Sequence, residues 1–224
     1  MRAYTEVSPM EAKHGGGRLR ANRLFAAFWE WAVRHESKTV RKIRQKTLAD
    51  ARGWVLEIGC GTGANFAYYP AGTQIVATEP DSEMLKRAQR KVQELGLKNV
   101  ELRQAAAEEI PYGDQGFDSV VSAWVFCHVD DALAALGEVR RLLKPGGTFI
   151  FMEHVRYDKS RFWRTAQDLL NPIWRRLLGA GCNVNRQTEQ AIEDAGFHIQ
   201  RLERAATGPL TSPTIYGVAS VGPR

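Results

Sequence analysis

The chain contains 224 residues, of which 44% are hydrophobic and 25% are charged, a composition that predicts one globular domain rather than a disordered chain. No apolar run reaches the roughly 18 to 20 residues that a membrane-spanning helix needs. The three cysteines are odd in number and far apart, without a CxxC pair for zinc or a secretory leader before residue 30, which favours a reducing cytoplasm. The net charge of +6 is concentrated in the first fifth of the chain, so the basic bias belongs to an arm.

Two segments precede the first predicted strand. Residues 1–20 are polar and lack hydrophobic periodicity, so we expect a flexible leader. Residues 21–50 have apolar side chains at helical spacing and predict one or two helices, with Asn22 as an N-cap. The first helix is expected to place five apolar side chains on one broad face: Leu24, Phe25, Phe28, Trp29 and Ala32. We interpret it as a lid that excludes water from a site, in preference to a helix that contacts anionic lipid.

The rest of the chain alternates between apolar strands and amphipathic helices. Five strands are predicted at residues 54–59, 73–79, 100–105, 117–124 and 147–153, with helices at 82–95 and 131–143. The C-terminal part contains an aromatic helical segment at 162–178, a helix ending near Gly196, and two strands at 197–204 and 214–221. The pattern predicts a Rossmann-like, doubly wound α/β fold. Its seven-stranded sheet is mostly parallel, with an antiparallel last strand and helices on both faces.

Three glycines, Gly59, Gly61 and Gly63, directly follow the first predicted strand in the sequence VLEIGCGTG. Backbone amides can approach a ligand closely where side chains are missing, and a doubly wound sheet binds nucleotides at this position. No lysine follows the glycines, as a P-loop requires, and their spacing is not the GxGxxG of a dinucleotide site. Glu57 would repel a phosphate. The motif therefore predicts a nucleoside ligand without phosphates.

The glycine motif resembles motif I of the class I S-adenosylmethionine-dependent methyltransferases. Glu79 at the end of the second strand, and the segments at 111–124 and 140–147, extend the resemblance over about residues 50–155. It implies S-adenosylmethionine as cofactor, S-adenosylhomocysteine as product, and a carboxylate contact from Glu79 to the ribose hydroxyls. The adenine-binding aspartate of many relatives is replaced by Ala106, so we assign that contact to the backbone of Ala107 or to Glu108. The full implied cofactor set is Glu57, Gly59, Cys60, Gly61, Gly63, Asn65, Glu79, Pro80, Met84, Ala107, Glu108 and Trp124.

The second half of the chain is similar to a methyltransferase-like group that includes membrane-associated alkyl thiol methyltransferases of animals. The similarity rests on FMEHV at 151–155, the segment at 162–188 and the ending SPTIYGVA. It implies one methyltransferase domain at 51–224, with a helical insert at about 158–182 that covers the acceptor. The substrate-binding candidates are Phe28, Trp29, Trp163, Gln167, Asn171 and Arg186, with Trp174 and Asn183 nearby.

His128 and His154 are the candidate catalytic residues, since a single histidine could help an acceptor to ionise. His128 has the alternative of a structural group that caps the fourth strand. Glu153 and His154 are adjacent on a strand and point to opposite faces, so we expect at most one of them to face the site. The methyl group is expected to move by in-line displacement, without a metal.

The expected function is methylation of a small, apolar acceptor, most simply the S-methylation of a thiol. The alternatives are N-methylation of a phospholipid amine and C- or O-methylation of a quinone-like molecule. A non-enzymatic, basic protein that binds RNA or a membrane is ranked last, because the domain has no basic stripe. We expect no nucleic-acid partner, and leave open both the oligomeric state and a peripheral membrane contact through the N-terminal helix.

Overall fold

The computed structural model describes residues 22–158, 160–173, 176, 181–207 and 213–222. The expected leader at 1–20, the candidate Trp174 and part of the expected insert lie outside these residues. Two helices, α1 (Arg23–Arg34) and α2 (Lys38–Leu48), come first, as predicted. Asn22 caps α1, accepting a hydrogen bond from the Phe25 amide to its side chain.

The remaining elements follow the predicted order closely. In chain order they are β1 (Trp54–Ile58), η1 (Phe66–Tyr68), β2 (Gln74–Thr78), α3 (Ser82–Glu94), β3 (Val100–Arg103), β4 (Phe117–Ala123), α4 (Ala132–Leu142), β5 (Leu143–His154), α5 (Arg161–Ile173), α6 (Thr188–Asp194), β6 (Phe197–Ala205) and β7 (Thr214–Val221). Strand β5 begins four residues before the predicted position at 147, because an irregularity in its pairing with β4 accommodates the turn at Gly146 and Gly147.

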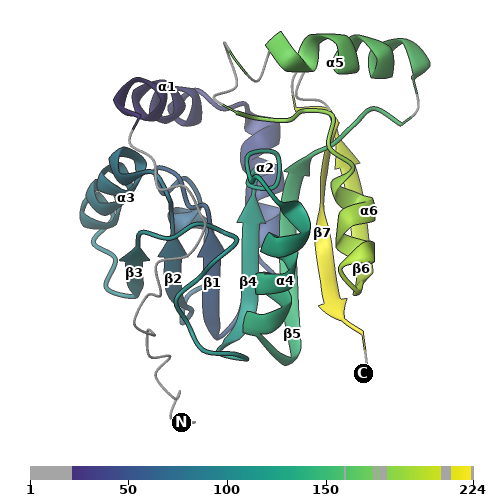
Figure 1. The fold of residues 1–224 in the computed structure, drawn as a ribbon. Coiled ribbons are helices and arrows are strands. Elements are labelled where there is room, and N and C mark those ends of the chain that lie inside the picture. The colour runs from purple at the N-terminus through teal and green to yellow at the C-terminus, as the bar shows by residue number, and fades with distance from the viewer. Residues whose placement is uncertain (1–21, 159, 174–175, 177–180, 208–212, 223–224) are drawn as a thin grey trace.

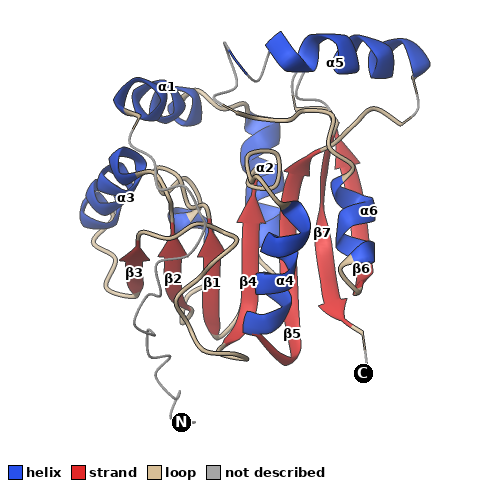
Figure 2. Ribbon diagram, viewed as in Figure 1, coloured by secondary structure: helices blue, strands red, loops and turns tan. Residues whose placement is uncertain are grey.

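Within the described residues, seven strands form one sheet in the order β3-β2-β1-β4-β5-β7-β6 (Figure 2). Strands β1 to β5 pair in parallel, with Leu56 of β1 opposite both Val76 of β2 and Val120 of β4. Strand β7 pairs antiparallel with β5 and with β6. The predicted Rossmann-like sheet with an antiparallel last strand is therefore confirmed.

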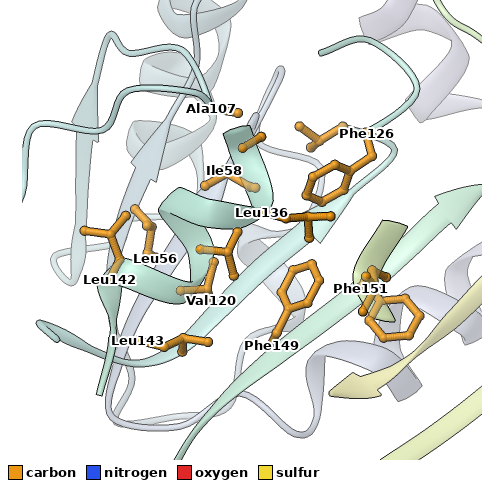
Figure 3. Packing of buried hydrophobic residues seen from close by; sticks show 14 of the residues in the cluster. Leu56, Ile58, Ala107, Val120, Phe126, Leu136, Leu142, Leu143, Phe149 and Phe151 are labelled. Atoms are coloured by element: carbon orange, nitrogen blue, oxygen red, sulfur yellow. The ribbon is translucent and has the colours of Figure 1, made fainter. Parts of the chain in front are cut away.

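Helices cover both faces of the sheet, as its continuously apolar strands require. On one face, Leu136 of α4 packs in a cluster with Val120 and Phe149, and Figure 3 shows these side chains together. On the other face, residues that end α2, form η1 and line α3 pack against β1, β2 and β4. No helix among the described residues is both long and apolar enough to cross a membrane.

Helices α1 and α5 lie beyond the carboxyl ends of the parallel strands (Figure 1). Ligands of open α/β sheets bind at this edge. The side chains of the predicted apolar face of α1 differ in burial: Leu24 is 85% exposed and Phe28 is 52% exposed, whereas Phe25 and Trp29 line a cavity. Only part of the face is therefore covered by the rest of the protein, and the exposed part continues to Trp31.

Candidate active site

The turn after β1 has a backbone that glycine alone adopts without strain. Gly59, Gly61 and Gly63 all have positive φ, of 61°, 57° and 81°. A Cβ at Gly59 would lie 2.7 Å from Val125, and one at Gly63 would lie 2.6 Å from the ring of Phe66. The glycines therefore allow the turn to pack closely against its neighbours, and they leave its upper side without side chains.

A cavity opens above this turn, between the carboxyl ends of the strands and helix α1. Twelve predicted residues line it: Trp29, Gly59, Cys60, Gly61, Asn65, Glu79, Pro80, Met84, Ala107, Glu108, Trp124 and His128. Phe25 of the predicted lid also lines the cavity, and sequence analysis missed other lining residues, including Arg44, Asp81, Val125 and Asp130. The cavity thus brings together ten of the twelve residues of the implied cofactor set, with Trp29 and His128.

Glu57 and Gly63 lie outside the cavity lining, contrary to expectation. Glu57 is 1% exposed beneath the turn, where it accepts hydrogen bonds from Asn65 Nδ2 at 2.7 Å and Tyr69 Oη at 2.8 Å. Burial raises the pKa of Glu57 to about 7, although these hydrogen bonds act in the opposite direction. The Glu57 side chain points beneath the turn, and it contacts the cavity lining through its hydrogen bond with Asn65.

Glu79 fixes the rim of the cavity at the end of β2. Its carboxylate accepts hydrogen bonds from the Gly61 amide at 2.8 Å and the Asp81 amide at 2.9 Å. Asp81 in turn caps α3, accepting hydrogen bonds from the amides of Glu83 and Met84, and also accepts one from the Asn22 amide at the start of α1. The Glu79 carboxylate therefore holds the glycine turn, and the Asp81 carboxylate joins the start of α1 to the start of α3.

Arg44 of α2 is the most informative residue that sequence analysis missed. It is 2% exposed, and its Nη2 donates to Glu36 Oε2 at 2.9 Å while its Nη1 donates to Asn65 Oδ1. Its Nε has no hydrogen-bond partner among the described residues, and the guanidinium lies 5.2 Å from the centre of the Trp124 ring. The sequence held one signal: Arg44 lies at helical spacing within the apolar face of α2 that includes Val40 and Leu48.

Trp124 forms the far wall of the cavity in a strained conformation. Its φ is 58°, which is uncommon for a large side chain, and its backbone amide donates to Met152 O at 2.7 Å. The ring meets Trp29 edge to face at 6.4 Å and stacks on His154 at 5.3 Å. Such strain persists where the surrounding structure enforces it, often at functional sites.

Of the two candidate catalytic histidines, one lines the cavity and the other does not. His128 lines the cavity, and its Nδ1 is 3.1 Å from Cys127 Sγ. His154 is 8% exposed behind Trp124 and does not line the cavity, so it cannot reach an acceptor there in this conformation. Glu153 is fully buried, accepts hydrogen bonds from the amides of Val125 and Phe126, and has its pKa raised to about 8 by burial. Neither Glu153 nor His154 faces the cavity, which agrees with the expectation of at most one.

The substrate candidates of α5 and its surroundings do not line this cavity. Gln167 and Asn171 are buried and bind backbone groups, Gln167 through Val155 O and Val184 O, and Asn171 through the Val184 amide. These contacts fasten α5 to the sheet, so both residues have a structural position. Arg186 donates to Val129 O at 2.9 Å and lines a separate polar pocket.

Two further substrate candidates are exposed at the surface. Trp163 of α5 is 46% exposed, and Phe28 points outward from α1. The candidate that the structure places in the cavity is Trp29.

Comparison with known proteins agrees with this architecture. A family model described as a methyltransferase domain matches residues 56–151. The thiol S-methyltransferase TMT1A of Homo sapiens is 37% identical over 170 residues, covering 74% of this chain and 69% of the human protein. A phosphatidylethanolamine N-methyltransferase of Cereibacter sphaeroides is 34% identical over 148 residues, covering 63% of this chain and 73% of that protein.

Solved structures share the fold at lower identity. A SAM-dependent methyltransferase from Aquifex aeolicus superposes with a TM-score of 0.63 at 17% identity, covering 91% of this chain and all of that one. A geranyl diphosphate C-methyltransferase from Streptomyces coelicolor A3(2), solved with S-adenosyl-L-homocysteine, has a TM-score of 0.65 at 14% identity and covers 94% and 92% of the two chains. The glycine turn, the cavity and these relatives together lead to one conclusion: the chain belongs to the class I S-adenosylmethionine-dependent methyltransferases, in the group that includes the thiol S-methyltransferases.

Proposed function

We propose that this methyltransferase transfers the methyl group of S-adenosylmethionine to the sulfur of a small, apolar thiol. The observation that carries the proposal is the aromatic wall formed by Phe25, Trp29 and Trp124, with His128 beside it. An apolar acceptor gains free energy by burying its surface against such a wall. The similarity to human thiol S-methyltransferases supports sulfur as the acceptor atom.

The cofactor is proposed to lie along the glycine turn. The backbone at Gly59 and Gly61 would contact the amino-acid part, and Glu79 would accept hydrogen bonds from the ribose hydroxyls, because an ionised carboxylate can accept about four hydrogen bonds. Met84, Ala107 and Glu108 line the cavity beyond Glu79, and we assign them to the adenine.

Arg44 is proposed to bind the carboxylate of the methionine part. A buried guanidinium is costly to desolvate, and Arg44 has Glu36 as its ion-pair partner and a remaining Nε donor. A ligand carboxylate would supply the second negative charge. This contact would place the sulfonium in the aromatic part of the cavity, which Trp29 and Trp124 line.

The proposed reaction is a direct displacement. The acceptor sulfur attacks the methyl carbon, the bond from that carbon to the sulfonium breaks, and S-adenosylhomocysteine leaves as a neutral thioether. Alignment of the two partners can contribute about 7 to 11 kcal/mol, so the protein's main task is to orient them. The thiol must lose its proton first, and His128 is the imidazole that lines the cavity.

An amine acceptor is the second candidate. The relative from Cereibacter sphaeroides is a phosphatidylethanolamine N-methyltransferase, and this observation favours a lipid amine over a quinone-like acceptor. A lipid acceptor would fit a peripheral membrane contact by the outer side of α1, where Leu24, Phe28 and Trp31 are exposed between Arg23 and Arg34.

Glu79→Ala is expected to weaken binding of S-adenosylhomocysteine, because each hydrogen bond to a charged group contributes about 1.5 to 3 kcal/mol, or at least about tenfold. Isothermal titration calorimetry measures the change. Glu94→Ala is the matched control, since this glutamate lies on the exposed side of α3. Equal affinity of the wild-type and Glu79→Ala proteins would show that the cofactor lies elsewhere.

The acceptor class can be tested with methyl-labelled S-adenosylmethionine and a panel of apolar thiols, amines and quinones. Thiols should be methylated, at a rate that rises with pH until the thiol ionises, near pH 8.5 for an unperturbed group. His128→Ala should lower the rate most below that pH, because above it the thiol ionises without assistance. Methylation of amines or quinones with every thiol inert would contradict the proposal.

The lid can be tested with two tryptophans of α1 that face different ways. Trp29→Ala should raise the KM for a soluble acceptor and lower kcat, because Trp29 closes the cavity above Gly61. Trp31→Ala, at a position that is 58% exposed, should leave both values unchanged but weaken cosedimentation with anionic vesicles if α1 contacts lipid. Unchanged kinetics for Trp29→Ala would mean that α1 is not a lid.

A further inference from the structure

Two cysteines and a histidine meet beside the cavity, although the sequence separates them widely. Cys127 and His128 follow β4, and Cys182 follows α5. Cys127 Sγ, Cys182 Sγ and a ring nitrogen of His128 all lie within 4.8 Å of one another. Within the described part of the chain, no other group of three His, Cys, Asp or Glu side chains lies close enough to share one metal ion.

The distances suit a tetrahedral metal. Zinc binds thiolate sulfur at about 2.3 Å and imidazole nitrogen at about 2.0 to 2.1 Å, so neighbouring ligand atoms of a tetrahedron are about 3.6 to 3.8 Å apart. Cys127 Sγ and His128 Nδ1 are 3.1 Å apart, and the remaining separations have 4.8 Å as their upper limit. Small rotations of the side chains would therefore place all three atoms around one ion.

The backbone holds the two cysteines together. The Asn183 amide donates to Cys127 O at 2.7 Å, so the residue after Cys182 is fixed to the other cysteine. Asn171 and Gln167 of α5 bind Val184 on the same segment. The pair is thus positioned by hydrogen bonds that do not involve the sulfur atoms.

The two cysteines of the cluster are shielded from solvent, and its histidine borders the cavity. Cys127 is fully buried and Cys182 is 4% exposed, whereas His128 lines the cavity. A site with three protein ligands and one remaining position is the arrangement of catalytic zinc, whereas structural zinc has four protein ligands. The burial and the ligand number both favour a catalytic type of site.

We propose that Cys127, His128 and Cys182 bind one Zn²⁺ ion whose fourth position takes the sulfur of the acceptor, an assignment of the acceptor that rests on the proposed function. A coordinated thiol is deprotonated, so the acceptor would bind as a thiolate with loss of its proton to solvent and displacement of a bound water. The sulfur then attacks the methyl carbon, the carbon bond to the sulfonium breaks, and the methylated thioether dissociates from the metal. His128 would assist ionisation as a ligand of the metal.

Metal-free protein titrated with Co²⁺ tests the site without any acceptor. One equivalent should produce the visible bands of a tetrahedral ion and a near-ultraviolet sulfur-to-cobalt band, and Zn²⁺ should abolish both. Cys127→Ser and Cys182→Ser should each lower the sulfur band to about half or less, because one thiolate ligand remains, and the double variant should lose it; His128→Ala should weaken Co²⁺ binding by more than about tenfold. Cys60→Ser is the matched control, because Cys60 is a buried cysteine outside the cluster and should retain the spectrum.

Circular dichroism of each variant verifies that it is folded. Absence of the sulfur band in the wild type, or its persistence at full intensity in both single cysteine variants, would overturn the site. Formation of a Cys127–Cys182 disulfide in the reduced, metal-free protein as soon as air is admitted, with no protection by Zn²⁺, would also overturn it.

The role in acceptor binding has a separate readout. Apolar thiols should shift the sulfur-to-cobalt band and amines should not. Full-rate methylation of thiols by metal-free protein would overturn this role while leaving the proposed function intact. A thiol-insensitive spectrum in a protein that methylates amines would instead contradict the proposed function and leave the metal site in place.

Discussion

The buried charge of Arg44 is the constraint on which the arrangement of the site depends. A guanidinium that is removed from water must find anionic and polar partners, or the folded state loses several kcal/mol. Glu36 supplies the charge from the turn between α1 and α2, and Asn65 supplies an oxygen and connects Arg44 to Glu57 under the glycine turn. The position of α2, the shape of the glycine turn and the end of the lid helix α1 are therefore coupled through one side chain.

The same coupling reaches the far wall of the cavity. Arg44 lies over the ring of Trp124, which also stacks on His154 and whose strained backbone is held by Met152. A cofactor whose carboxylate reaches Arg44 would have the rest of its amino-acid part against the aromatic side chains that line the cavity. The polar and apolar parts of the cavity thus correspond to the two parts of the methyl donor.

The fold could be predicted from the sequence because its signals are local. Apolar strands alternate with amphipathic helices, and the glycine motif marks the turn where backbone geometry and ligand binding coincide. The sides of α1 could not be predicted, because Leu24 and Phe25 are equally apolar and tertiary contacts decide which one is covered. The position of Glu57 could not be predicted for a similar reason. The sequence around the glycines does not indicate whether this side chain points into the cavity or beneath the turn.

The acceptor side was harder to predict, because its contacts join distant segments. Gln167 and Asn171 are polar residues of the kind that often bind substrates. Here their side chains form hydrogen bonds with the backbone of Val184. The proximity of Cys182 to Cys127 depends on the pairing of the Asn183 amide with Cys127 O, a contact between distant segments that no local pattern indicates. Arg44 was not predicted as a site residue because it lies in a segment that contains many basic residues. It differs from the exposed basic residues of that segment by its position on the apolar side of α2.

Calorimetry with two ligands tests the role of Arg44 most directly. S-adenosylhomocysteine carries the amino-acid part, and 5′-methylthioadenosine lacks it. We expect Arg44→Met to weaken binding of S-adenosylhomocysteine by at least about tenfold, as expected for the loss of a charged hydrogen bond, while binding of methylthioadenosine changes little. Equal losses for both ligands would show that Arg44 supports the cavity without contacting the carboxylate.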